Sequence, residues 1–244
     1  MTAAVEFEPG LIVRGRAAQQ PALALSDFKL VAFDMDSTLI NIECVDEIAA
    51  AAGRKAEVAA ITEAAMRGEI TDFADSLRRR LALLRGVPVA ALETVYTQQL
   101  RLNPGVELFV QACQAAGLKT LLVSGGFTFF SDRVRARLRL DFARANVLEL
   151  ADGHLTGELM PQPWGTVVDG AEKRRTLLEV AGLLGIAPGQ TIAVGDGAND
   201  LPMMAAAGLS IAFHAKPAVR EQALVAVNEG GLDRALTVFG RRPT

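Results

Sequence analysis

The chain has 244 residues and a mass of 25.9 kDa, with 50% hydrophobic and 22% charged residues. This length suits one large domain, or one domain that carries a smaller insertion. The formal net charge of −3 offers no basic field to a nucleic-acid backbone, so we expect no nucleic-acid partner. Charge or glycine interrupts every apolar run before it reaches the ~18 residues of a membrane span, so we expect no membrane segment either.

The N-terminal segment, residues 1–26, precedes the first clear pattern and is interpreted as an extension. The Leu-Ile-Val at 11–13 predicts a short strand, and the Gln-Gln-Pro at 19–21 is typical of a linker. The sequence leaves open whether this extension covers the sheet or contacts a second subunit, and the oligomeric state with it.

The two cysteines and the N-terminal residues indicate the cellular compartment of the protein. Glu6 and Glu8 stand where a signal peptide would carry basic residues. Cys44 and Cys113 form neither a CxxC pair nor a disulfide framework, and alone they cannot hold zinc. These features predict a protein of the reducing cytoplasm.

After the extension, short apolar β-rich runs alternate with longer helical patterns, which predicts an α/β protein with a parallel sheet. Three of these runs, at 30–33, 120–123 and 191–194, end in polar or glycine residues. Ligands of parallel sheets bind beyond the carboxyl ends of the strands. We therefore expect the three polar strand ends to meet at one site.

Between Asn41 and Asn103 the strand-like runs disappear. The periodicity predicts helices at roughly 42–52, 55–67, 71–85 and 88–100. A helical insert directly after the first strand predicts a cap over the carboxyl edge of the sheet, able to move on its two connections. A packed helical subdomain without such motion is the alternative.

The first polar strand end reads Asp-Met-Asp-Ser-Thr over residues 34–38. Desolvating Asp34 and Asp36 together is costly unless a cation joins the two carboxylates. A turn or capping role is the structural alternative, because Asp and Ser favour such positions.

A second acidic strand end covers residues 195–200, Gly-Asp-Gly-Ala-Asn-Asp. Its Gly-x-Gly start is also found in dinucleotide-binding loops, but Asp200 stands where the third glycine would be and would repel a pyrophosphate. The chain also lacks the GxxxxGK[ST] pattern of a P-loop. Asp196 is better interpreted as a metal ligand and Asp200 as a supporting acid.

Two further features are suited to anion binding. Ser124-Gly125-Gly126 would let backbone N–H groups approach an anion closely, although a plain glycine turn is the more ordinary explanation of this motif alone. Lys173 precedes a helical run, where a solvated surface position is the ordinary explanation.

Together these residues make a charge argument. Four carboxylates at one sheet edge need a divalent cation, and an all-oxygen ligand set selects Mg²⁺. The cation can bridge a phosphoryl oxygen while lysine and glycine N–H groups hold the others. One carboxylate is then free to attack phosphorus and another to transfer protons. The pattern predicts phosphoryl transfer with hydrolysis as its end.

Asp34-x-Asp36-x-Thr38, Ser124, Lys173 and Gly195-Asp196-Gly197-x-x-Asp200 match, in order, the four motifs of the haloacid dehalogenase superfamily, which the chain therefore resembles. Within that superfamily it is similar to the phosphoserine phosphatases in the stretches 33–41, 76–80, 123–127 and 193–200.

The resemblance implies a Rossmann-like parallel core at 27–41 and 104–244, with a helical cap at 42–103 inserted after the first core strand. It implies hydrolysis of O-phospho-L-serine, the last step of serine biosynthesis, through an aspartyl-phosphate. The alternatives are a phosphatase or phosphotransferase of this superfamily acting on another small phosphomonoester, or a non-catalytic module that binds Mg²⁺ and a phospho-ligand.

By the resemblance, Asp34 is the nucleophile and Asp36 the general acid/base. Mg²⁺ would be held by Asp34, Asp196 and the backbone carbonyl of Asp36. The implied phosphate ligands are Ser124, Gly125 and Lys173. Asn199 would contact the substrate or the attacking water.

In the cap, the resemblance assigns Glu43 to the ammonium group of the substrate and Arg80 to its carboxylate, with Met66 and Phe73 as an apolar wall. Helical periodicity independently places Arg80 on the apolar stripe that contains Phe73. A cation there needs a partner, which is either the substrate, a protein carboxylate or solvent reached by snorkelling. Glu43 falls on a polar face with Glu47, so its role follows from the resemblance alone.

Overall fold

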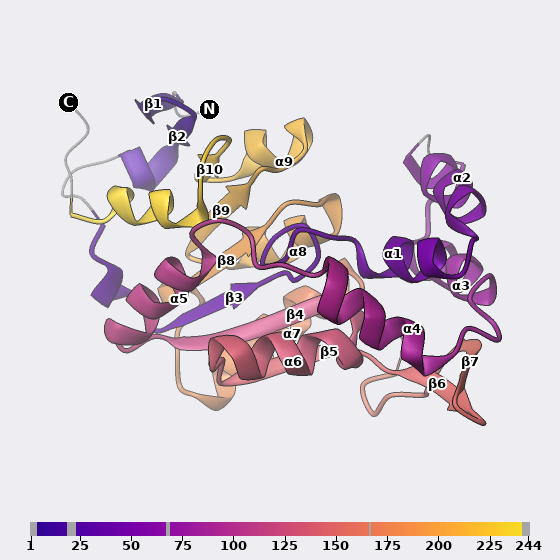
Figure 1. Ribbon diagram of the computed structural model, residues 1–244. Helices are drawn as coiled ribbons and strands as arrows, with labels where there is room; N and C mark the ends of the chain where they lie inside the picture. Colours follow the sequence, from indigo (N-terminus) through magenta and orange to yellow (C-terminus); the bar gives the residue numbers. More distant parts are fainter. Residues whose placement is uncertain (1–3, 19–22, 67–68, 166, 241–244) are drawn as a thin grey trace.

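The structure, a computed structural model, describes residues 4–18, 23–66, 69–165 and 167–240, and only the backbone of residues 65 and 66 (Figure 1). A sheet flanked by helices makes up one end of the molecule, and a smaller group of helices lies at the other end. Within the described ranges, no helix combines the length and apolar character needed to cross a membrane. The predicted linker at 19–21 lies outside the described residues.

The core sheet has the strand order β1-β2-β10-β9-β8-β3-β4-β5 in the described part of the chain. The strands are β1 (Val5–Glu8), β2 (Leu11–Val13), β3 (Leu30–Phe33), β4 (Lys119–Phe127), β5 (Phe142–Asn146), β8 (Thr191–Gly195), β9 (Leu209–Phe213) and β10 (Val225–Val227). From β10 to β5 all neighbours are parallel, whereas β1 and β2 pair antiparallel at one edge. The predicted α/β class with a parallel core is confirmed.

The three strands predicted to end at one site are neighbours in the sheet. Phe33 at the end of β3 pairs with Leu122 of β4 on one side and Val194 of β8 on the other. Their carboxyl ends therefore lie at the same edge. The short strand predicted at 11–13 is β2, which pairs with β10 and so joins the N-terminal extension to the core sheet.

Two hydrophobic clusters sandwich the sheet, which explains the unbroken apolar character of its strands. The helices that cover the sheet are α5 (Val106–Ala115), α6 (Thr128–Leu138), α7 (Gly170–Leu183), α8 (Leu201–Ala206) and α9 (Pro217–Gln222). Val31 and Phe33 of β3 belong to the cluster shared with α5 and α6, and Leu30 and Ala32 belong to the cluster shared with α7, α8 and α9. Burying one large apolar side chain stabilises the fold by roughly 1.5–3 kcal/mol. Short 3-10 turns occur at Gly15–Ala18, Leu25–Asp27, Pro188–Gln190, Ala198–Asp200 and Leu232–Val238.

The cap lies between β3 and β4 in the chain. Its helices are α1 (Cys44–Ala51), α2 (Lys55–Met66), α3 (Phe73–Ala82) and α4 (Val89–Thr94), the last continuing as a π-helical turn, Val95–Gln99. These lie within the four segments predicted as helical. The two connections run side by side, because Asn41 and Arg101 exchange hydrogen bonds: the Arg101 nitrogen donates to Asn41 Oδ1 at 2.7 Å and the Asn41 nitrogen to the Arg101 carbonyl at 3.0 Å.

A hairpin of β6 (Leu148–Ala151) and β7 (His154–Leu159) reaches from the core to the cap (Figure 1). Its turn has positive φ at Asp152 (48°) and Gly153 (75°), the conformation that an Asp-Gly pair favours between antiparallel strands. At Gly157 a Cβ would lie 3.2 Å from the carbonyl oxygen of Leu81, so α3 packs directly on the hairpin backbone. This hairpin was not predicted from the sequence, although its Asp-Gly signal is present.

Candidate active site

Asp34 follows β3 directly and is the best-buried carboxylate facing the cavity between core and cap, with 6% of its surface exposed. Its Oδ1 accepts a hydrogen bond from the backbone nitrogen of Met35 and forms an ion pair with Lys173 Nζ, both at 2.7 Å. One carboxylate oxygen is thus fixed in place, and the side chain as a whole faces the cavity.

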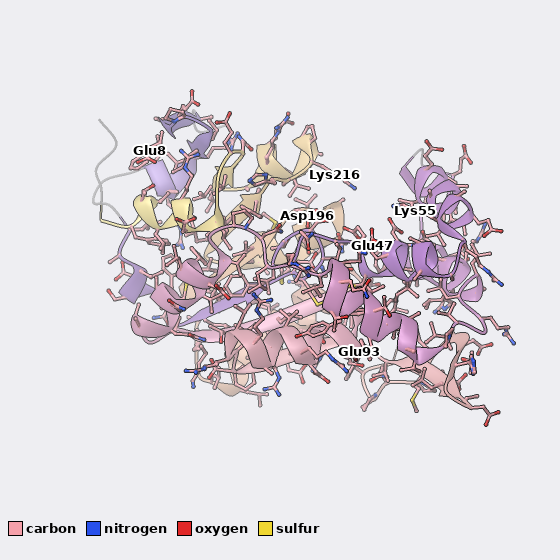
Figure 2. All side chains as sticks on the ribbon, viewed as in Figure 1. Glu8, Glu47, Lys55, Glu93, Asp196 and Lys216 are labelled. Carbon is pink, nitrogen blue, oxygen red and sulfur yellow. The ribbon has the colours of Figure 1, made fainter. Side chains whose placement is uncertain are left out.

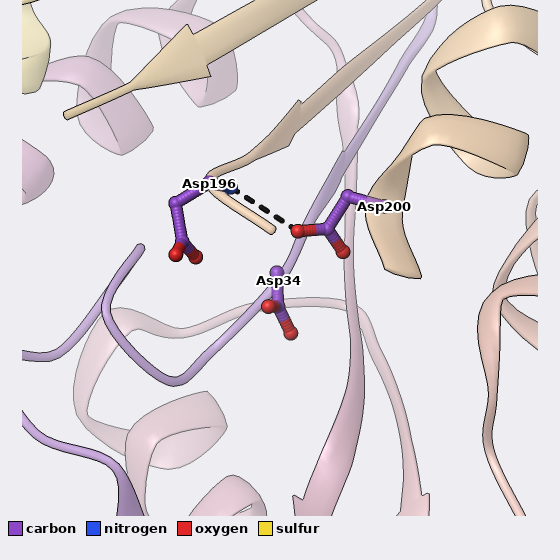
Figure 3. A group of neighbouring side chains, drawn as sticks. All are labelled: Asp34, Asp196 and Asp200. Carbon is purple, nitrogen blue, oxygen red and sulfur yellow. Dashed lines mark hydrogen bonds between the residues drawn. The ribbon is translucent and has the colours of Figure 1, made fainter. Parts of the chain in front are cut away.

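Asp34, Asp196 and Asp200 form an acidic cluster, with one oxygen of each carboxylate within 4.8 Å of the others (Figure 3). Both oxygens of Asp200 are already used: Oδ1 by Lys173 at 2.7 Å, and Oδ2 by the backbone nitrogens of Asp196 and Gly197 at 3.1 and 3.0 Å. This fold-back needs a glycine at position 195, where a Cβ would lie 2.5 Å from Asp200 Cγ. Asp200 therefore fixes the backbone at the end of β8 through its hydrogen bonds and does not face the cavity.

Asp196 lies between the core strands and the cap helices, where Glu47 and Lys55 mark the cap side (Figure 2). The Thr38 hydroxyl donates to its Oδ1 at 2.9 Å. Burial, reinforced by the charge of Asp200, raises the pKa of Asp196 to about 7, and the same two causes raise the pKa of Asp34 well above its ordinary value. Such crowding of negative charge around oxygen donors fits a small divalent cation, which would relieve it.

Lys173 is fully buried near the start of α7, so the solvated surface position considered for it is wrong. Burial by itself lowers the pKa of a lysine, but Asp200 and Asp34 outweigh it and raise the pKa of Lys173. The ammonium group therefore stays charged at neutral pH. It bridges two carboxylates behind the cavity.

Asp36 lies in the same cavity, but its carboxylate is turned toward the cap instead of joining the acidic cluster. The backbone nitrogen of Cys44 donates to Asp36 Oδ2 and the Cys44 thiol to Oδ1, both at 3.1 Å. Burial and then the charge of Glu43 raise the pKa of Asp36 to about 7. Burial and Asp36 raise the pKa of the Cys44 thiol, which stays protonated. The four carboxylates expected at one edge thus divide into a group of three and a separate Asp36.

The loop that carries Asp36 is held from the far end of the cap. Asn103 Nδ2 lies 3.1, 3.0 and 3.0 Å from the carbonyl oxygens of Ser37, Thr38 and Ile40. The backbone reverses at Ser37, whose φ is 56°. This contact explains why the chain returns to the core at Asn103, a function that the sequence did not indicate.

The Ser-Gly-Gly segment ends β4 and lines the cavity. Ser124 Oγ is buried and accepts from the Gly126 nitrogen at 2.9 Å. The Gly125 carbonyl accepts from Asn146 Nδ2 at 2.8 Å, and Asn146 Oδ1 accepts from the Val168 nitrogen at 2.9 Å. Asn146 therefore positions this loop. It was missed because a lone Asn at a strand end has no distinctive spacing.

The cavity between core and cap has a volume of about 1000 Å³. Of the predicted site residues, it is lined by Asp34, Asp36, Glu43, Phe73, Arg80, Ser124, Gly125, Asp196 and Asn199. Phe73 closes over the Ser-Gly-Gly loop, because a Cβ at Gly125 would lie 2.8 Å from its ring. Lys173 and Asp200 lie behind this wall. The Met66 side chain lies outside the described residues.

The cap side of the cavity carries both signs of charge. Arg80 is half-buried, and burial lowers its pKa while Asp46 and Glu43 oppose that effect. Glu43 is exposed, precedes α1 and accepts from the Ser37 hydroxyl at 2.7 Å. Asp46 was not predicted as a site residue from the sequence. It lines the cavity one helical turn after Glu43, and its buried Oδ1 has no hydrogen-bond partner among the described residues.

Comparisons with known proteins agree with this site. Residues 28–208 match the family model of haloacid dehalogenase-like hydrolases. The chain is 68% identical, over 95% of its own length and 97% of the relative's, to a phosphoserine phosphatase of Polaromonas sp..

Among solved structures, a phospho-aspartyl intermediate analogue of a phosphoserine phosphatase is 39% identical and superposes with a TM-score of 0.80, covering 87% of this chain and 99% of that one. A substrate-bound phosphoserine phosphatase complex is 38% identical with a TM-score of 0.79, over 87% of this chain and 98% of that one. The chain therefore belongs to the haloacid dehalogenase-like hydrolases, in the group that contains these phosphoserine phosphatases.

Proposed function

We propose that the chain is a Mg²⁺-dependent phosphohydrolase that converts O-phospho-L-serine to L-serine and phosphate, and so completes serine biosynthesis. The observation that carries the proposal is a buried Asp34 that faces a capped cavity, pairs with Lys173 and adjoins the acidic cluster. The relatives named above support phosphoserine as the substrate.

Asp34 is the nucleophile in this proposal. Its carboxylate attacks phosphorus, a P–O bond to Asp34 forms, and the P–O bond to the serine oxygen breaks. Asp36 gives its proton to the departing serine oxygen. In the second half, Asp36 takes a proton from water, the resulting hydroxide attacks phosphorus, and the Asp34 carboxylate and inorganic phosphate are released. A pKa of about 7 suits Asp36 to both transfers.

Asp34, Asp196 and the backbone carbonyl of Asp36 would hold Mg²⁺. The oxygen donors of these residues fit that ion, which supplies the charge neutralisation that lets a carboxylate approach a phosphate dianion. Ser124, Gly125 and Lys173 bind the phosphoryl oxygens. Asn199 contacts the substrate or the attacking water.

The cap selects the substrate in this proposal. Arg80 binds the carboxylate of phosphoserine, and Glu43 binds its ammonium group. Phe73, with Met66, forms the apolar wall that excludes water. We further propose that residues 42–103 move as a lid over the core of residues 27–41 and 104–244, turning about the paired connections at Asn41 and Arg101, with residues 1–26 as an extension.

A phosphate-release assay tests this function. The substrates are O-phospho-L-serine, phosphoethanolamine, 3-phosphooxypropanoate and glycerol phosphate, each assayed with Mg²⁺ and with EDTA. Phosphoserine should be hydrolysed most efficiently, without an added acceptor alcohol, and EDTA should abolish turnover until Mg²⁺ is restored. If another ester is hydrolysed more efficiently, that ester is the substrate and the assignment of phosphoserine is wrong. If no ester is hydrolysed with any metal, the chain is a binding module and not a phosphatase.

A further inference from the structure

Cys44, the first residue of cap helix α1, is tied to the carboxylate of Asp36. Its backbone nitrogen lies 3.1 Å from Asp36 Oδ2 and its thiol sulfur 3.1 Å from Oδ1. One residue thus donates to both carboxylate oxygens, and this pair of bonds fixes the rotation of the Asp36 side chain.

The thiol occupies a place where packing alone does not require a donor. Cys44 is fully buried and belongs to the same apolar cluster as Leu39 and Ile48, where a methyl or isopropyl group would also pack. The neighbouring acid, Glu43, is engaged by Ser37 at 2.7 Å and does not compete for the thiol. Asp36 is thus the acceptor that the thiol meets.

We infer that Cys44 is a positioning residue: its thiol orients Asp36 so that the acid faces the leaving oxygen of the substrate. The backbone nitrogen alone would hold one oxygen and leave the carboxylate plane free to turn. Because Cys44 begins α1, the acid is oriented only while the cap is docked, which links cap closure to proton transfer. This inference rests on the proposed role of Asp36 as general acid.

The dependence of kcat/KM on the leaving group tests this inference. Cys44→Ala removes the thiol donor and keeps the backbone donor. Phosphoserine has a strongly basic alkoxide leaving group that needs a proton from Asp36, and p-nitrophenyl phosphate has a stable leaving group that does not. We expect kcat/KM to fall about tenfold on phosphoserine and less than about twofold on p-nitrophenyl phosphate, as loss of one hydrogen bond to a charged group implies.

The controls separate positioning from packing. Cys44→Ser should restore most of the loss, because the hydroxyl donates. Cys113→Ala removes a second buried free cysteine, in α5, and should leave the ratio of the two substrates unchanged. Thermal melting establishes folding, and Cys44→Val, which fills the site without a donor, replaces the alanine variant if that variant does not fold.

Equal losses on both substrates, or a wild-type ratio in folded Cys44→Ala or Cys44→Val, would overturn the inference. An incorrect assignment of phosphoserine as the substrate can be distinguished from an incorrect role of Cys44. If the wild-type protein hydrolyses alkyl and aryl phosphates but not phosphoserine, the comparison of alkyl with aryl esters still decides the role of Cys44.

Discussion

Lys173 is the residue whose burial most constrains the site. Its ammonium group is wholly shielded from water and compensates two carboxylates, Asp34 and Asp200, at 2.7 Å each. Breaking a buried ion pair from one side is far more costly than breaking an exposed pair, because the partner charges stay buried. In the proposed mechanism the same group also binds the phosphoryl oxygens, so Lys173 would stabilise the fold and contribute to catalysis.

Replacing Lys173 by methionine tests its contributions to stability and to turnover. Lys173→Met should lower the free energy of unfolding by about 3 kcal/mol or more in urea titrations and abolish turnover. Lys119→Met, which breaks an exposed pair with Asp141, is the matched control and should cost no more than about 1 kcal/mol. Comparable small losses in both variants would contradict the account of Lys173.

Arg80 is the residue that sets substrate preference in the proposal. Arg80→Ala should reduce kcat/KM for phosphoserine about 100-fold, the loss of a charge-assisted pair of ~2–3 kcal/mol. Phosphoethanolamine, which lacks the carboxylate, should be hydrolysed almost as before. Arg79→Ala is the matched control, because Arg79 is exposed and pairs with Asp75 at 2.8 Å. Equal losses of kcat/KM on both substrates would show that Arg80 does not bind the substrate carboxylate.

Among the elements, the junction of β4 and β5 depends on one acid. Asp141 accepts from Lys119 Nζ at 2.8 Å, and from the Thr120 backbone nitrogen and hydroxyl at 2.9 Å each. Burial acts to raise the pKa of Asp141, but these donors outweigh it, and the pKa is lowered from 3.8. The folded state therefore holds the proton less tightly than the unfolded state does.

A lowered carboxyl pKa contributes stability that is present above the unfolded value and is lost as the pH falls through the folded value. Asp141→Asn should therefore lower the free energy of unfolding by about 1 kcal/mol at pH 7. The difference from the wild-type protein should begin to shrink as the pH falls below about 4, where the unfolded state binds the proton first. It should vanish only below the lowered pKa of the folded state, where both states bind the proton. Urea titrations of the variant and the wild-type protein, at pH 7 and in acid, measure this difference in the free energy of unfolding. A difference that grows in acid would have the wrong sign.

Between elements, the sequence is informative where chemistry and spacing coincide. Short β-rich, mainly apolar runs followed by Asp34, Ser124 or Gly195 identify strands that end at one edge, and parallel topology brings those ends together. Burial of Lys173 and the contact of Cys44 with Asp36 could not be read in the same way. Both features depend on which segments, distant in the sequence, pack against each other. A lysine or a cysteine alone does not indicate which residue it will contact.

At the scale of the whole molecule, the proposed cation would link the site to the stability of the fold. Burial and crowding raise the pKa values of Asp34 and Asp196, so the metal-free fold carries unfavourable charge at neutral pH. Asp196→Asn should raise the melting temperature of the EDTA-treated protein, because it removes one of these charges. Mg²⁺ should raise the melting temperature of the wild-type protein and have little effect on the variant. Equal responses to Mg²⁺ would place the ion elsewhere.

The whole arrangement of sheet edge, buried lysine and cap serves one atom in this account, the Asp34 oxygen that accepts the phosphoryl group. The most direct test is steady-state phosphate release from O-phospho-L-serine by Asp34→Asn, whose side chain keeps the size of the carboxylate but not its charge. We predict no turnover above background, with a thermal melt as cooperative as that of the wild-type protein. A folded Asp34→Asn variant with undiminished kcat would contradict the central claim.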